Sequence, residues 1–114
     1  MRIETIHHSQ AVVVVIDGEM DNTVVSELHA VMDELVASGV QNYVIDLSRV
    51  TFMDSSGLAA LASLYRRIRI GNGDVRLCNP PADVRRIMEL TRFDRVFEIY
   101  TRREDAIASF GPPE

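Results

Sequence analysis

The chain passes from a predicted strand into a predicted helix at Val50-Thr51-Phe52-Met53-Asp54-Ser55-Ser56-Gly57-Leu58-Ala59-Ala60-Leu61. A strongly apolar segment, Tyr43–Leu47, precedes this stretch, and apolar residues at helical spacing follow it. The first turn of a helix leaves backbone N–H groups unpaired and carries a partial positive charge. A serine at this position is exposed, and a phosphate on it would meet favourable electrostatics. We therefore interpret Ser55 as the centre of a switch.

Outward from this stretch, the apolar pattern predicts alternating strands and helices. Continuous β-branched runs are typical of strands buried on both faces, and spacings of three and four residues are typical of one helical stripe. The predicted strands are Arg2–His8, Ala11–Asp17, Asn42–Leu47, Asp74–Cys78 and Arg95–Tyr100. The predicted helices are Asp21–Gly39, Ser55–Ile70, Ala82–Thr91 and Thr101–Phe110, with Ser48–Met53 as a loop.

The ends of these elements carry capping signals. Gly18 is expected to end the second strand, and Asp21 or Asn22 to cap the first helix. Asp54 or Ser55 is expected to cap the second helix, and Gly57 to allow close packing. Thr101 followed by Glu104 predicts a capping box at the last helix.

The predicted order is β-β-α-β-α-β-α-β-α, which is an α/β fold. Strands separated by helices run parallel with right-handed crossovers, whereas the first two strands are close enough to be antiparallel. We expect a mixed sheet of four or five strands with about four amphipathic helices packed on it. A chain of 114 residues is one domain, which we assign to residues 1–110, with a short tail at 111–114.

Composition excludes several classes of function. The net charge of −5 argues against a nucleic-acid partner. The longest apolar run, Ala11–Ile16, is too short to span a bilayer, and the first residues lack the apolar segment of a signal peptide. Cys78 is the only cysteine, which excludes an internal disulfide and fits a reducing cytoplasm.

Charge is unevenly placed along the chain. Residues 1–60 hold two Arg and nine acids, whereas residues 61–114 hold ten Arg and eight acids. An acidic half suits a basic partner surface, although an ordinary solvated surface would look the same.

A second polar stretch, Gly18-Glu19-Met20-Asp21, follows the predicted strand Ala11–Asp17. If its strand has parallel neighbours, this stretch lies beside the end of Asn42–Leu47 and hence beside Ser55. Asp17, Glu19 and Asp21 would then form an acidic rim around the hydroxyl; the alternative is a helix cap with solvated charges. Carboxylates can bind hard cations, but no second cluster has ligand spacing, so we expect no metal site.

Catalysis is a poor fit to these residues. The G-x-S-x-G turn is absent, and neither His7, His8 nor His29 has an obvious route to a serine. The glycines at Gly71–Gly73 precede a strand rather than a helix, so they predict a turn and not a nucleotide loop. We expect no catalytic residue and no cofactor.

Taken together, Phe52–Leu58 after Ile45–Leu47 resembles the signature of the STAS domain, and more narrowly of the bacterial anti-sigma factor antagonists. Gly18–Asp21 stands where that family has a G-E-x-D stretch. In the C-terminal half of the chain, the residues that resemble the family are Asn79, Pro80, Val84, Ile87, Leu90, Phe93 and Phe97. The family often has Gly after the Ser or Thr that ends its third helix, whereas here Thr91 is followed by Arg92.

The resemblance implies a partner-switching protein. Its unphosphorylated form would bind an anti-sigma factor that is also a serine kinase of the GHKL ATPase type, and this binding would free a sigma factor. The kinase would phosphorylate Ser55, with Ser56 as the competing hydroxyl, and a phosphatase would reset the switch. The implied partner-binding residues are Gly18, Glu19, Asp21, Met53, Asp54, Ser56 and Gly57. The alternative is a constitutive STAS scaffold or subunit, as in stressosome-like or lipid-transport complexes, without phosphorylation.

Overall fold

The structure is a computed structural model that describes residues 2–23 and 25–111. Its strands are β1 (Arg2–His7), β2 (Val12–Met20), β3 (Asn42–Met53), β4 (Asp74–Cys78) and β5 (Glu98–Tyr100). Its helices are α1 (Val25–Ala37), α2 (Ser55–Ile70), α3 (Ala82–Leu90) and α4 (Arg103–Ala108), with a 3₁₀ turn η1 (Phe93–Arg95). The predicted α/β class and element order are confirmed. Most of the predicted tail, residues 112–114, lies outside the described residues.

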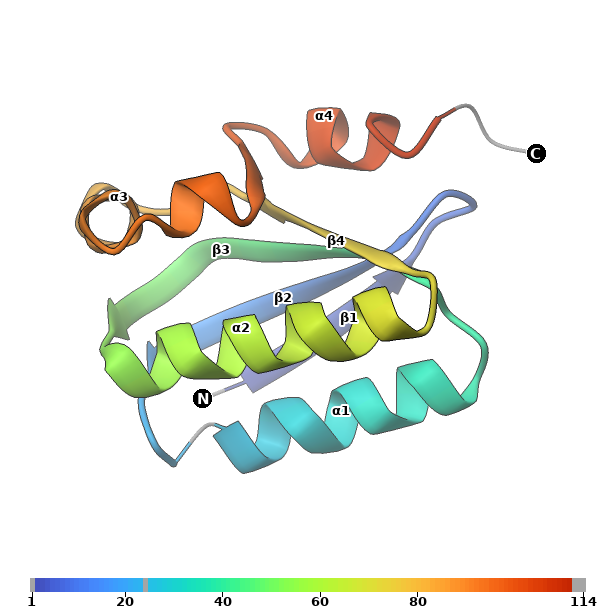
Figure 1. Cartoon of the computed structure of the whole chain (residues 1–114), viewed down its shortest axis with the longest axis horizontal. Helices are drawn as coiled ribbons and strands as arrows, with labels where there is room; N and C mark the ends of the chain where they lie inside the picture. Colours follow the sequence, from blue (N-terminus) through green and yellow to red (C-terminus); the bar gives the residue numbers. More distant parts are fainter. Residues whose placement is uncertain (1, 24, 112–114) are drawn as a thin grey trace.

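The five strands form one mixed sheet in the order β1-β2-β3-β4-β5. β1 pairs antiparallel with β2, and the other neighbouring strands pair in parallel. Figure 1 shows α1 and α2 side by side along one face of the sheet, with α4 across the other face. In the part of the chain that the structure describes, no helix is long and apolar enough to cross a membrane.

Two apolar cores lie on the two faces of this sheet. Val12, Val14 and Ile16 of β2 belong to the larger core under α1, α2 and α3. Val13 and Val15, which alternate with them, belong to the smaller core under α4. Because successive strand residues point to opposite faces, a continuous β-branched run suits a strand that is covered on both sides. The predicted double burial of this strand is confirmed.

The central strands are longer than predicted. β3 continues to Met53, so the predicted loop Ser48–Met53 is wrong, and β2 continues to Met20 instead of ending at Gly18. These two extensions pair with each other, but the register shifts between Gly18 and Glu19. Gly18 has a φ of 117°, a conformation that glycine adopts without steric cost. Such irregularities break the alternation of buried and exposed residues by which strands are recognised.

Three other boundaries also differ. The last strand begins at Glu98 rather than Arg95, because the chain first forms η1. Arg92 before this turn has a φ of 66°, at the position where the family often has Gly. The predicted capping box is wrong: α4 starts at Arg103, and its N-cap, Arg102, makes no side-chain cap hydrogen bond. α1 starts at Val25, after the predicted cap residues.

Candidate functional site

The start of α2 is organised by Asp54. This residue is the N-cap, and its Oδ1 accepts the backbone N–H of Ser56 at 2.9 Å and that of Gly57 at 3.3 Å. Of the two predicted caps, the structure selects Asp54. Ser55 is thereby the first residue of the helix, at the end where unpaired N–H groups create a partial positive charge.

The two neighbouring serines differ in exposure. Ser55 is exposed, and within the described residues its hydroxyl makes no hydrogen bond, as predicted for a displayed side chain. Ser56 is half-buried and lines a hollow of about 320 Å³ between α1 and α2, across from Val25 and His29. Ser55 is therefore the more accessible of the two hydroxyls.

The second predicted stretch lies beside the first. In the parallel pairing of β2 with β3, Met20 is opposite Met53 and Glu19 is opposite Phe52. A Cβ atom on Gly57 would lie 2.6 Å from the carbonyl oxygen of Met20 and 3.0 Å from Cγ of Met53. The absence of a side chain on Gly57 thus lets the first turn of α2 pack directly against the ends of both strands.

The predicted partner-binding residues divide by burial. Glu19 is exposed, and Asp21, Asp54 and Ser56 are half-buried, so all four can touch a partner. Gly18 is also half-buried. Met53 and Gly57 are buried, so they shape the surface from below instead of contacting a protein laid over it.

The surface around Ser55 is acidic. Thr23 donates its hydroxyl at 2.6 Å and its backbone N–H at 3.0 Å to Oδ1 of Asp21, which lowers the pKa of that carboxyl. Within the described residues, no ion pair neutralises Glu19, Asp21 or Asp54. Asp17, which we expected in the same rim, instead faces Arg49 with its Oδ2 3.9 Å from Nη1.

A metal centre is not indicated at this surface. In residues 2–23 and 25–111, no group of three or more His, Cys, Asp or Glu side chains is arranged to hold a metal ion.

Sequence reasoning missed one residue of this surface, Phe52. Its side chain is 48% exposed although it lies in a strand, and it is opposite Glu19 in the sheet. Large exposed aromatic side chains are common anchors of protein interfaces. The sequence signal that could have indicated this contact residue was a large aromatic side chain in the predicted loop shortly before Ser55.

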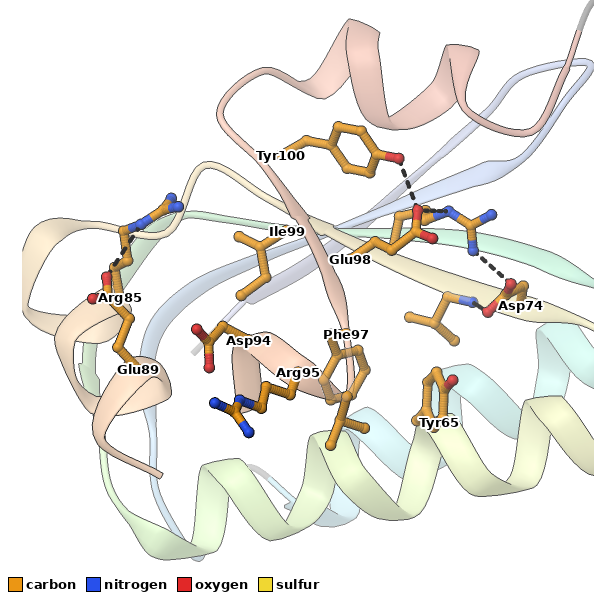
Figure 2. A pocket seen from close by; sticks show the side chains of 13 residues that line it. Tyr65, Asp74, Arg85, Glu89, Asp94, Arg95, Phe97, Glu98, Ile99 and Tyr100 are labelled. Carbon is orange, nitrogen blue, oxygen red and sulfur yellow. Dashed lines mark hydrogen bonds and ion pairs between the residues drawn. The ribbon is translucent and has the colours of Figure 1, made fainter. Parts of the chain in front are cut away.

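A larger hollow lies elsewhere, along β5 (Figure 2). It measures about 790 Å³, and none of the predicted site residues lines it. Its charges are largely paired: Arg76 contacts Asp74 at 2.6 Å and Glu98 at 3.1 Å, and Arg85 contacts Glu89 at 3.4 Å. This hollow is separate from the surface around Ser55.

Comparison with known proteins adds an independent finding. The sequence pattern of the STAS domain family matches residues 2–106. The anti-sigma F factor antagonist of Paenibacillus polymyxa is 27% identical over 108 residues, which cover 94% of this chain and 92% of that protein. An anti-sigma factor antagonist from Mycobacterium paratuberculosis has a structure with a TM-score of 0.85 and 28% identity, covering 96% of this chain and 92% of that one.

Two structures of the anti-sigma factor antagonist SpoIIAA, one unphosphorylated and one phosphorylated, are similar to the structure of this chain. Its unphosphorylated form has a TM-score of 0.81 and 23% identity, covering 95% of each chain. Its phosphorylated form, from Bacillus, has a TM-score of 0.75 and 22% identity, covering 96% of this chain and 100% of that one. At these identities the likeness establishes a shared fold.

Proposed function

We propose that this chain, which belongs to the STAS domain family, is an anti-sigma factor antagonist whose binding is controlled by phosphorylation of Ser55. The observation that carries the proposal is the exposed Ser55 at the start of α2, with the end of β2 packed beside it. The names of its relatives support the antagonist role. The phosphorylated state of SpoIIAA supports a fold that accommodates phosphate.

The proposed partner is an anti-sigma factor that is also a GHKL-type serine kinase. It would cover Ser55 together with Gly18, Glu19 and Asp21 on one side and Asp54 and Ser56 on the other, over the buried Met53 and Gly57. Binding would release a sigma factor, and a serine phosphatase would restore the binding form. This exchange would take place in the cytoplasm, where sigma factors act.

Phosphorylation would change binding far more than folding. A phosphate adds roughly −1.5 to −2 charges at neutral pH, and the N-terminus of a helix accommodates an anion. A partner packed over Ser55 would have to desolvate this phosphate next to Asp54 and Asp21. Repulsion and desolvation together can supply about 3 kcal/mol, which corresponds to roughly a hundredfold loss of affinity.

A phosphorylation assay tests the assignment of the site. The chain is incubated with the GHKL-type kinase of its own organism and ATP, and the modified residue is located by tandem mass spectrometry. We expect phosphate on the wild-type chain and on Ser56→Ala, and none on Ser55→Ala. Full phosphorylation of Ser55→Ala would show that the wrong hydroxyl has been assigned.

A binding assay tests the consequence. Ser55→Asp is expected to weaken kinase binding by at least tenfold while thermal unfolding stays within about 0.5 kcal/mol of wild type. Loss of stability instead of affinity would make Ser55 a structural residue. Tight binding of Ser55→Asp, with no phosphate on the wild-type chain, would favour the constitutive scaffold.

A further inference from the structure

A second surface lies towards the other end of α2. It is a hollow of about 530 Å³ lined by Ala62, Tyr65, Arg66, Arg69, Ile70 and, beyond η1, Val96. The side chains of Ile70 and Val96 are 78% and 50% exposed. Several apolar side chains that share one hollow are typical of a protein contact site, unlike single apolar residues scattered on a surface. We call this hollow the α2 groove.

The rim of the α2 groove is positively charged. Arg66 and Arg69 line it, and no described carboxylate does. Arg69 also contacts Asp74, with Nη1 3.3 Å from Oδ2, whereas Arg66 has no ion pair with any described residue. The neighbouring hollow in Figure 2 differs, because most of its arginines are paired with carboxylates. The two hollows share Val96, but the hollow along β5 also contains the carboxylates of Asp74, Glu89, Asp94 and Glu98, whereas no described carboxylate lines the α2 groove, where Arg66 is without a described ion pair.

The α2 groove shares a helix face with Ser55 but lies far along it. At about 100° per residue, Ala62, Arg66 and Arg69 point within roughly 40° of the direction of Ser55. At about 1.5 Å per residue, Arg66 is roughly 16 Å further along the helix. This exceeds the Debye length of about 8 Å at physiological salt, so a phosphate on Ser55 would act only weakly on this arginine.

We propose that the α2 groove docks an acidic amphipathic segment of a partner protein. An apolar side chain of that segment would pack between Tyr65, Ile70 and Val96, and flanking carboxylates would pair with Arg66 and Arg69. Burial of the apolar side chain supplies affinity, and the arginines select acidic over basic or neutral segments. This docking is independent of the phosphorylation proposed for Ser55.

The test is a titration of the ¹⁵N-labelled chain, followed by NMR, with a synthetic helical peptide. The peptide carries two leucines four positions apart with glutamates on both sides; a matched peptide has glutamines instead. We expect chemical-shift changes at Ala62, Arg66, Ile70 and Val96, and binding of the glutamine peptide at least fivefold weaker in low salt. Equal binding of the two peptides, shifts outside the groove, or no binding at millimolar peptide would overturn the proposal.

Matched variants identify the residues responsible. Arg66→Glu is expected to weaken binding of the glutamate peptide at least tenfold, and Arg86→Glu on α3, also exposed and without a described ion pair, less than twofold. Ile70→Ser is expected to weaken binding, and Leu90→Ser, 74% exposed on α3, is not. Equal losses in both members of a pair would contradict the proposal.

Two further measurements determine whether the α2 groove acts independently of Ser55 and whether it binds a second copy of the chain. Ser55→Asp should bind the glutamate peptide within twofold of wild type; a large loss would make the groove part of the switch. The spectrum of the chain alone should not change on dilution. Dilution shifts at the groove residues would show that its occupant is a second copy of the chain, which contradicts a separate partner.

Discussion

Among single residues, Gly57 links the fold most directly to the proposed switch. It allows the first turn of α2, which carries Ser55, to pack against the ends of β2 and β3. Gly57→Ala would place a methyl group 2.6 Å from the carbonyl oxygen of Met20, too close for any real contact. We expect a loss of about 1–3 kcal/mol from overpacking, which exceeds the gain of up to about 1 kcal/mol from helix propensity. Thermal unfolding measures this loss of stability, because each kcal/mol lowers the Tm of a domain of this size by roughly 4–8 °C.

Gly71→Ala is the matched control for this substitution. A Cβ atom there would lie 3.6 Å from its nearest neighbour, the carbonyl oxygen of Ile68, and this is an ordinary contact distance. We expect its stability to stay within about 0.5 kcal/mol of wild type. If Gly57→Ala is as stable as Gly71→Ala, α2 is not pressed against β2 in the way described.

Phe52 provides a test of the partner-facing surface that does not involve the hydroxyl. Phe52→Ala is expected to weaken binding to the anti-sigma factor by at least tenfold, because truncating an aromatic anchor commonly costs about 2 kcal/mol or more. Since the side chain is 48% exposed, the substitution should change the free energy of unfolding little. Calorimetric titration measures the affinity, with Leu90→Ala, 74% exposed on α3, as control. Unchanged affinity would show that the partner does not cover Phe52.

Among the contacts between helices and strands, one buried charge adds to the apolar packing that holds α4 on the sheet. Asp46 of β3 is 2% exposed, and its Oδ2 accepts Nε of Arg103 at 2.9 Å and Nη2 at 2.7 Å. Its Oδ1 accepts the backbone N–H of Ser48 at 2.9 Å. A buried carboxylate is tolerated when both oxygens accept hydrogen bonds and a cation is paired with it. Without the cation, the buried charge destabilises the folded state.

Removing the cation should therefore destabilise the protein. Arg103→Met is expected to cost up to about 3 kcal/mol, at the low end for buried pairs because Arg103 itself is one-third exposed. Arg102 forms an exposed ion pair with Glu104, so Arg102→Met should lower the free energy of unfolding by less than about 0.5 kcal/mol. Urea unfolding of Arg103→Met, Asp46→Asn and the double variant Asp46→Asn/Arg103→Met gives the coupling energy between the two side chains, with Arg102→Met unfolded in the same way as control. Equal effects of the two Arg substitutions would show that Asp46 does not hold α4.

For the molecule considered as one unit, Cys78 reports on opening of the core. Its side chain is fully buried in the core under α4, and burial, followed by the negative charge of Asp46, raises the pKa of the thiol to about 12. Burial disfavours the thiolate, so at pH 8 the folded chain presents almost none of the reactive form.

Thiol labelling should therefore follow unfolding. In native buffer at pH 8, Cys78 is expected to react with a disulfide reagent orders of magnitude more slowly than the urea-unfolded chain. Its rate should rise with urea over the same range as the loss of circular dichroism. Rapid labelling without denaturant would mean that α4 opens locally and that the sheet face beneath it is accessible.

Much of this architecture follows from short-range signals. The β-branched run of β2, the helical stripes of α1 and α2, and an acid placed before two serines each depend on residues within a few positions of one another. Periodicity and capping are local properties, so the sequence alone predicted the element order, the mixed sheet and the exposure of Ser55.

Tertiary structure decided what no local window contains. The ends of β2 and β3 extend because they pair across the sheet, in a register that bulges interrupt. Arg103 meets Asp46 from 57 positions away, and Val96 completes a hollow on a helix that ended far earlier in the chain. These contacts form because apolar surface is buried between distant segments, and burial of that kind depends on how the elements pack rather than on the spacing of neighbouring residues.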